Sequence, residues 1–204
     1  MKRIFKIVVS FILIFVFAIG IMILFSPYGK GKLYKNRYLA CSIEVNASKE
    51  ITYKILGNSD NARKWSVFVH HISTLNSNEI SDGSVGSVRR CFQQEDENGL
   101  RWDEEILVNE VNSRRRLSIF NMVHFDLSAD NLMTDQLYEN YDGGCKLTFT
   151  IFFDPTKRIS FIDELKMYFA AYKAEEIFEK NLENIKNLIE RGDTYERVHL
   201  FIKQ

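Results

Sequence analysis

The segment from Ser160 to Arg191 constrains the fold most, because it is the longest uninterrupted helical pattern after the N-terminal apolar run. Its apolar residues recur every three or four positions and therefore form one stripe along a helix. The stripe consists of Ala171, Ala174, Phe178, Leu182, Ile185 and Ile189. The segment has no interior glycine or proline, and Gly192 follows it as a C-terminal cap. A long amphipathic helix must bury its stripe against another layer, and the preceding sequence predicts that this layer is an antiparallel sheet.

The first part of that layer is predicted between Tyr38 and Leu75. Residues 38–46 alternate between apolar and polar side chains, which indicates a half-buried strand. Asn46-Ala47-Ser48 then starts a short helix that ends at Gly57-Asn58, and a further helical turn is expected over Ser59–Lys64. Residues 65–75 carry β-branched and aromatic side chains and are predicted to form a second strand.

Two tight turns predict the pairing of the next three strands. Asn98-Gly99 is a strong signal for a two-residue hairpin turn, and Asn112-Ser113 is interpreted as a second one. The apolar residues of the three strands then share one side of the sheet. The first turn sets Cys91 opposite Ile106, Arg89 opposite Val108 and Gln93 opposite Glu104, and the second sets Ile106 opposite Ile119 and Val108 opposite Leu117.

A last hairpin precedes the long helix. Residues 125–134 lack a clear period and are interpreted as a loop. Residues 135–141 and 145–153 flank Asp142-Gly143-Gly144, and the second arm alternates cleanly between apolar and polar side chains. The tail from Tyr195 to Ile202 is apolar enough to form a final strand or a docked end.

The N-terminus carries an apolar run over residues 7–25, and ~20 such residues span a hydrocarbon core. We interpret it as an uncleaved, single-pass membrane anchor, since the apolar region of a cleaved signal peptide is usually shorter. Basic residues flank both ends of the run in similar number, so the side of the membrane stays open. The predicted organisation is an anchor over 1–26, a basic tether over 27–37 and a domain over 38–204. The tether is interpreted as a solvated linker, although a basic stretch can also lie against anionic headgroups.

Composition excludes several function classes. With 204 residues, 46% of them hydrophobic, and a formal net charge of zero, the chain has room for one core and does not have the charge of a nucleic-acid binder. Its three cysteines form no CxxC pair, and their odd number argues against a disulfide framework. His70 and His71 point to opposite sides of a strand, and His124 is remote. We therefore expect no metal and no cofactor, and no hydrolase nucleophile motif is present.

The order of strand, two short helices, antiparallel strands and one long helix resembles the α+β helix-grip fold. At residue level, segments between Tyr38 and Arg191 are similar to the START-like and polyketide cyclase/dehydrase-like proteins of the SRPBCC superfamily. The similar segments are Ser42–Ser48, Ala62–Trp65, Asp82–Gly86 (DG-x-x-G), Trp102–Ile106 (W-x-E), Gly143–Thr148 and Leu182–Glu190. The chain departs from the family at Cys145, where threonine is common, and in its added membrane helix.

This resemblance implies an apolar cavity between the sheet and the long helix, which binds lipids, polyketides, hormones or similar molecules. It does not imply catalysis, since the superfamily includes enzymes, lipid carriers and sensors. Aromatic residues such as Trp65 and Trp102 either line such a cavity or form ordinary core. The residues predicted to contact a ligand are Arg89, Cys91, Glu104, Ile106, Val108, Leu117, Ile119, Phe149 and Phe169.

Two charged residues of this set decide the chemistry. Glu104 either faces the apolar cavity, where a carboxyl group would have a raised pKa, or lies at the solvated mouth of the sheet, which we favour. Arg89 either meets an anionic group of a ligand or extends from the sheet edge to water. Our first hypothesis is a membrane-anchored, non-catalytic binding domain for a hydrophobic small molecule or lipid. The alternatives are a cyclase or aromatase that uses Glu104 and Arg89 on a polyketide-like substrate, and a structural module whose cavity is filled by its own side chains.

Overall fold

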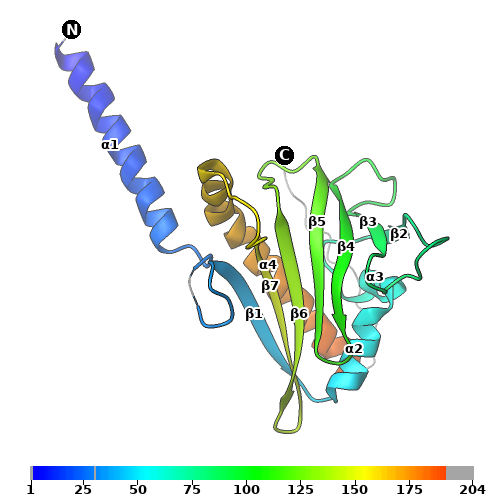
Figure 1. Cartoon of the computed structure of the whole chain (residues 1–204). Coiled ribbons are helices and arrows are strands. Elements are labelled where there is room, and N and C mark those ends of the chain that lie inside the picture. The colour runs from blue at the N-terminus through cyan, green and yellow to red at the C-terminus, as the bar shows by residue number, and fades with distance from the viewer. Residues whose placement is uncertain (1, 30, 192–204) are drawn as a thin grey trace.

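A computed structural model describes residues 2–29 and 31–191 of the chain (Figure 1). Seven antiparallel strands form one sheet in the order β1-β7-β6-β5-β4-β3-β2. The strands are β1 (Tyr38–Val45), β2 (His71–Thr74), β3 (Val88–Phe92), β4 (Arg101–Glu110), β5 (Arg114–Val123), β6 (Leu132–Tyr141) and β7 (Gly144–Phe153). The helices are α1 (Lys2–Leu24), α2 (Lys49–Gly57), α3 (Ala62–Trp65) and α4 (Phe161–Arg191), with a 3-10 turn η1 at Ser59–Asn61. The α+β helix-grip fold predicted from the sequence is confirmed.

Helix α4 crosses one face of the sheet, as its apolar stripe predicts (Figure 1). Ser160 caps its first turn, because the hydroxyl accepts a hydrogen bond from the backbone N–H of Asp163 at 3.0 Å. Leu182 and Ile185 are buried against the sheet, and Ala171 is buried nearer the start of the helix. We call the side of the sheet that packs on α4 the inner face and the opposite side the outer face.

The core consists of two apolar clusters between the inner face and the helices. The first cluster joins β1, β7 and the second half of α4, and its buried members are Leu39, Cys41, Leu56, Tyr138, Cys145, Leu147, Phe149, Leu182 and Ile185. The second joins the other end of β7 to the first half of α4, and its buried members are Tyr28, Ala129, Leu132, Phe153, Met167 and Ala171. Ile151 is only partly buried and packs against both clusters.

Local sequence signals predicted the position of several elements correctly. Ser48 accepts a hydrogen bond from the backbone N–H of Ile51 at the start of α2, which ends at Gly57 as predicted. The hairpin between β6 and β7 turns at Asp142 and Gly143, because Tyr141 pairs with Gly144. Gly143 has a φ of 91°, which glycine adopts without strain. The predicted loop before β6 is shorter than expected, since β6 already begins at Leu132.

The prediction of a strand over residues 65–75 is wrong for its first half. Trp65 ends α3, and only His71–Thr74 forms a strand. The hydroxyl of Ser66 accepts hydrogen bonds from the backbone N–H groups of Phe68 and Val69, at 3.1 and 2.9 Å. Such local bonds compete with the ladder of a sheet and turn the chain instead.

The predicted register of β3 and β4 is also wrong. Arg89 lies opposite Glu104 and not opposite Val108, and Cys91 lies opposite Trp102 and not opposite Ile106. The connection is longer than a two-residue turn, because the backbone N–H of Gln93 bonds to Leu100. The shift covers four residues, an even number, so Arg89, Cys91, Glu104 and Ile106 still share one face.

An irregularity in β4 changes the face of Val108. Ile106 lies opposite Leu117, whereas Val108 lies opposite Arg116, so the predicted pairs of Ile106 with Ile119 and of Val108 with Leu117 are both wrong. The register shifts between Ile106 and Val108, and an extra residue of this kind reverses the alternation of a strand. Val108 therefore shares the outer face with Arg116.

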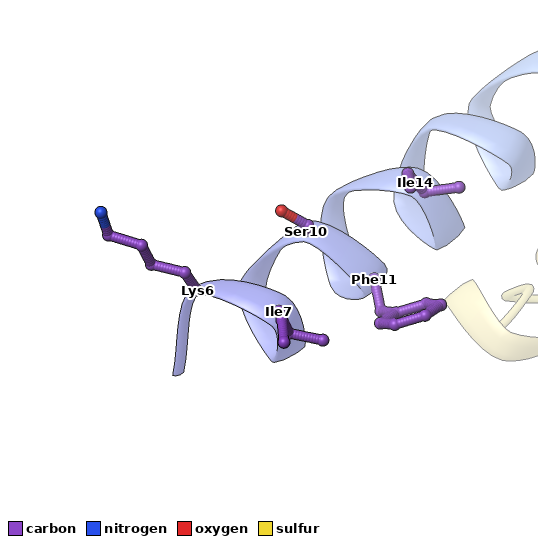
Figure 2. A pocket seen from close by; sticks show the side chains of 5 residues that line it. All are labelled: Lys6, Ile7, Ser10, Phe11 and Ile14. Atoms are coloured by element: carbon purple, nitrogen blue, oxygen red, sulfur yellow. The ribbon is translucent and has the colours of Figure 1, made fainter. Parts of the chain in front are cut away.

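The N-terminal helix α1 points away from the rest of the protein (Figure 1). Residues Ile4–Leu24 have a mean hydropathy of 3.2 and are long and apolar enough to cross a membrane, a property that signal sequences share. Figure 2 shows an open pocket on α1 lined by Lys6, Ile7, Ser10, Phe11 and Ile14. Since one helix forms this pocket, and lipid would cover it in a membrane-spanning segment, we do not consider it a ligand site.

Aromatic residues of the segment between α1 and β1 pack against the domain, although Lys32 and Lys35 are exposed. Tyr28 is 3% exposed and makes edge contacts with the rings of Phe153 and Tyr168. Gly29 then forms an antiparallel bridge with Tyr38, the first residue of β1. Tyr34 lies on the outer face, where its ring stacks on Phe152 at 4.5 Å. The segment thus wraps around the edge strand, and its interpretation as a free linker is wrong. The predicted element over residues 195–202 lies outside the described residues.

Candidate functional site

The charged residues predicted for the inner face form a close pair. Arg89 of β3 lies opposite Glu104 of β4, and its Nη2 and Nε atoms lie 2.8 and 2.9 Å from the Glu104 Oε2 atom. The side chains are 10% and 13% exposed. The expectation that Glu104 lies at a solvated mouth is therefore wrong. The third nitrogen of Arg89, Nη1, donates to the hydroxyl of Ser59 at 3.2 Å.

A further donor serves the carboxylate of Glu104, since the indole N–H of Trp102 donates to its Oε1 atom at 2.9 Å. A carboxylate has about four acceptor positions, and the bonds from Arg89 and Trp102 occupy three of them. Glu104 is thus bonded through both of its oxygen atoms.

The charges of this pair follow from its surroundings. Burial alone lowers the pKa of Arg89, but the adjacent Glu104 carboxylate more than offsets it, so the pKa of Arg89 is raised and the guanidinium stays charged. Burial, followed by the negative charge of Glu104, raises the pKa of the Cys91 thiol well above its usual value. Cys91 is therefore a neutral thiol at physiological pH and a poor nucleophile.

Aromatic rings border the pair. Phe68 stacks on Trp102 with ring centroids 5.2 Å apart, and Phe125 meets the same indole edge to face at 6.0 Å. Phe68 and Phe125 are both only partly buried. No sequence signal marks either residue, because both lie outside the regular strands and helices and only the folding of the chain brings them to Trp102.

The other predicted ligand contacts divide into three groups. Ile106 and Leu117 lie opposite each other and are fully buried, and Phe149 is buried in the first core cluster. Ile119 lies opposite Glu104 and is only partly buried, so it borders the charged pair. Val108 faces the other way. Phe169 lies two residues from both Met167 and Ala171, which puts it on the side of α4 away from the buried stripe.

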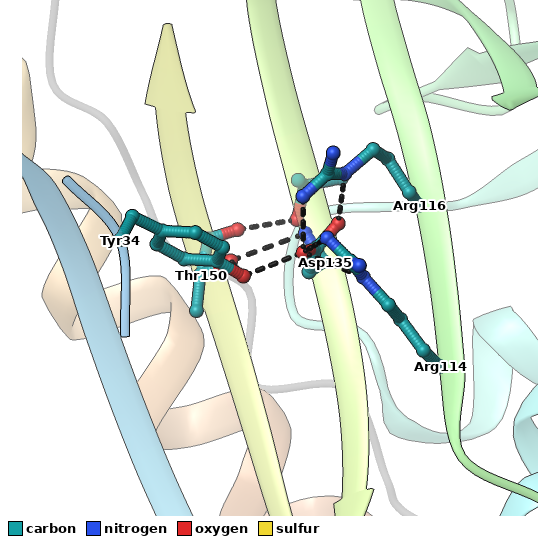
Figure 3. A network of polar contacts seen from close by, with 6 residues as sticks. Tyr34, Arg114, Arg116, Asp135 and Thr150 are labelled. Carbon is teal, nitrogen blue, oxygen red and sulfur yellow. Dashed lines mark hydrogen bonds and ion pairs between the residues drawn. The ribbon is translucent and has the colours of Figure 1, made fainter. Parts of the chain in front are cut away.

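A second charged network, on the outer face, was missed by the sequence analysis (Figure 3). The carboxylate of Asp135 is fully buried and accepts hydrogen bonds from Arg114, Arg116 and the hydroxyl of Tyr34. The shortest bonds from the two guanidinium groups measure 2.7 Å. The alternation of Arg114 and Arg116 on one strand was the available signal, but their partner lies on the next strand and Tyr34 comes from the N-terminal segment. This network holds that segment against the sheet.

The described residues provide no metal site. Over residues 2–29 and 31–191, no three His, Cys, Asp or Glu side chains lie close enough together to hold a metal ion. The Nδ1 atoms of His70 and His71 lie 3.0 Å apart, and the Nε2 atom of His71 lies 3.2 Å from Glu97. This contact is a local one at the sheet edge.

Comparison with known proteins shows the fold. No family model matches the sequence, and no curated protein matches it. Among solved structures, protein MLL2253 from Mesorhizobium loti matches with a TM-score of 0.57 and 13% identity, over 77% of this chain and 99% of that protein. XoxI from Bacillus cereus matches with a TM-score of 0.56 and 15% identity, over 76% and 98%. Major latex-like protein 151 from Panax ginseng matches with a TM-score of 0.55 and 12% identity, over 73% and 94%.

These matches cover 73–77% of this chain and 94–99% of the other proteins. The protein Ara h 8.0201 shares the same fold at a TM-score of 0.50 and 13% identity. The helix-grip fold expected from the sequence is thereby confirmed. At these identities, the likeness shows the architecture alone.

Proposed function

We propose that this protein is a membrane-anchored domain that binds a hydrophobic small molecule or lipid between the inner face of the sheet and α4, without catalysis. One observation carries the proposal. Three apolar side chains of the inner face and α4 are only partly buried: Ile151 packs against both core clusters, Phe178 against the first and Ile119 against the second. A protein interior normally closes over such side chains. A bound apolar molecule would cover them.

The Arg89–Glu104 pair supports a ligand with a polar end. Ile119 lies directly opposite Glu104, so the partly buried apolar surface continues up to the charged pair. Arg89 uses three of its five N–H groups in the contacts to Glu104 and Ser59. The remaining donors suit a carboxylate, phosphate or carbonyl oxygen of an amphiphilic ligand.

The same geometry argues against the cyclase or aromatase alternative. A general acid or base needs a pKa near the working pH and an available proton or lone pair. Both oxygen atoms of Glu104 are engaged, Oε2 by Arg89 and Oε1 by the indole of Trp102. We therefore assign Arg89 and Glu104 a binding role.

Anchoring through α1 supports a lipid as the ligand. A site held at the bilayer surface meets membrane-resident molecules at a high effective concentration. The packing of Tyr28 and Tyr34 on the domain supports a folding unit that begins near Ser26 rather than at Tyr38. The anchor and the binding domain would then be joined without a flexible linker.

Native mass spectrometry of the full chain, purified from membranes in a synthetic detergent, tests the binding proposal. We expect a discrete adduct of lipid-like mass that organic extraction removes. Ile119→Trp fills the proposed space and should reduce the adduct at least severalfold. Ile51→Trp is the matched control, because Ile51 is 51% exposed on α2, away from the inner face.

Two results would count against this function. A clean apo mass from natural membranes, with no adduct after incubation with extracted lipids, would favour a domain whose interior is filled by its own side chains. Equal adduct loss in both tryptophan variants would show that the lipid is bound to α1 or the surface rather than between the sheet and α4.

A further inference from the structure

The first turn of α4 exposes two large apolar side chains side by side. Phe161 is 78% exposed and Ile162 is 64% exposed, although both begin a helix whose later turns are well packed. Single exposed apolar residues are common on protein surfaces, but adjacent large ones at a helix end indicate a contact surface. The question is what covers them.

The neighbouring contacts of α4 indicate the answer. The Tyr172 hydroxyl donates a hydrogen bond to the backbone carbonyl of Met22 at 2.7 Å, in the last turns of α1. The hydroxyl of Ser26 donates to the backbone carbonyl of Tyr168, also at 2.7 Å. The start of α4 lies on the same side of these contacts as the body of α1 (Figure 1). A membrane that contains α1 would therefore reach the first turn of α4.

The charges around this turn suit an anionic membrane surface. Lys157 and Arg158 are exposed just before α4. The acidic residues of the first turn are already engaged, since Glu164 pairs with Arg37 and Asp163 bonds to Ser160. Lys157 lies 3.9 Å from Asp154, whereas Arg158 forms no ion pair with a carboxylate of residues 2–29 and 31–191. Basic residues beside exposed apolar ones are typical of segments that lie in the lipid headgroup layer.

We propose that Phe161 and Ile162 insert into the interface of the membrane that α1 spans, with Arg158 beside the lipid phosphates. The domain then has two membrane contacts, and the end of the sheet–helix space nearest the start of α4 faces the bilayer. This inference rests on the proposed anchoring by α1. It adds an orientation for the domain, which one membrane helix alone does not set.

Depth-dependent fluorescence quenching of the full chain tests this orientation. Ile162→Cys is labelled with a nitrobenzoxadiazole probe, and the protein is reconstituted into phosphatidylcholine–phosphatidylglycerol vesicles. Asp142→Cys, exposed in the β6–β7 turn, is the matched control, and the native cysteines are buried. The unsubstituted chain reports background labelling. We expect a blue-shifted emission and severalfold stronger quenching by nitroxide lipids at position 162 than at position 142.

The outcomes separate this inference from the proposed function. Extraction of the protein by alkaline washing would refute the anchor itself. A protein that resists washing but whose probes at 162 and 142 are equally exposed to water would refute the second contact and leave the anchor intact. A probe at 162 that is shielded from water but not quenched by nitroxide lipids would also overturn it, and would show that another protein surface covers this turn.

Discussion

Each face of the sheet buries a carboxylate that is paired with arginine, but the surroundings of the two carboxylates differ. On the outer face, Asp135 is 0% exposed and is held by two arginines and by Tyr34 (Figure 3). On the inner face, Glu104 is held by one arginine, and its neighbours include the partly buried Ile119. On the outer face, protein groups cover the charge of Asp135 completely. On the inner face, the Arg89–Glu104 pair lies next to apolar surface that the protein covers only in part.

This contrast shows that a buried ion pair does not by itself identify a functional site. Burial raises the pKa of Asp135, and the hydrogen bonds from Tyr34 and Arg116 oppose that effect. All of its partners belong to the fold, so the network joins the N-terminal segment to β5 and β6. Arg89 retains free donors and lies beside aromatic rings, so the proposed ligand binding concerns the inner pair, and we expect a structural role for the outer network.

The largest expected effect is that of Asp135→Asn. It leaves Arg114 and Arg116 without a counter-charge, and removing one partner of a buried ion pair costs about 3–5 kcal/mol. We expect this loss in the free energy of unfolding, measured by denaturant titration of the detergent-solubilised chain. Glu110→Gln, at the exposed end of β4, is the control. A loss as small as that of the control would contradict the structural role of the outer network.

Arg89→Met should have a smaller effect on stability, of about 2–3 kcal/mol, because Glu104 keeps its bond to Trp102 and is partly exposed. Its effect on ligand retention should be larger than that of Asp135→Asn. Adduct intensity per folded molecule in native mass spectra compares the two variants. If Asp135→Asn removes the ligand and Arg89→Met does not, the roles of the two faces are reversed.

Tyr34→Phe removes one hydrogen bond to a charged group, which is worth about 1.5–3 kcal/mol. We expect a loss near the lower end, since the ring still stacks on Phe152. Trypsin should also cleave faster at the exposed Lys32 and Lys35, because the segment is held less firmly. Tyr141→Phe, with a 46% exposed side chain, serves for comparison and should change neither measurement.

The smallest expected effect concerns Asp103, on the outer face. Burial on its own raises the pKa of this carboxyl group, but hydrogen bonds from Arg90 and Asn121 hold it below its usual value. A lowered folded-state pKa contributes stability that is complete above the unfolded pKa of about 3.9 and is lost as the pH falls through the folded value. Because Arg90 is one-third exposed, we expect about 1 kcal/mol from this pair.

Unfolding of the parent chain and of Asp103→Asn between about pH 6 and about pH 3 tests this sign. The difference between the two proteins should shrink as the pH falls. A difference that grows with acidification would mean that the pKa of Asp103 is raised in the folded protein.

Local signals were enough for the elements whose conformation depends on their own residues. The stripe of α4, the Ser48 cap of α2 and the Asp142-Gly143 turn all contain their physical cause within a few residues. The connection between β3 and β4 was predicted wrongly because a local turn signal alone was used to set the register. Asn98-Gly99 is a good turn pair, but Glu97 adopts a φ of 61° and the chain pairs again only at Gln93 and Leu100.

The candidate site was only partly predictable. Period-two alternation put Arg89, Cys91, Glu104 and Ile106 on one face, and an even register error left that result intact. The alternation predicted the wrong face for Val108, because the register shift in β4 reverses the alternation and no clear sequence signal marks that shift. It also gave no distance between Arg89 and Glu104.

The sequence by itself determined the apolar helix α1, the length and stripe of α4, and the alternation that separates the two faces of the sheet, since each depends on residues close together in the chain. The tertiary structure decided which charges meet. Tyr34 reaches Asp135 across 101 positions, and Phe68 and Phe125 meet at Trp102 from separate loops. Such contacts follow from the closure of the sheet around α4, where packing and buried charge pairing select one register among several that local propensity allows.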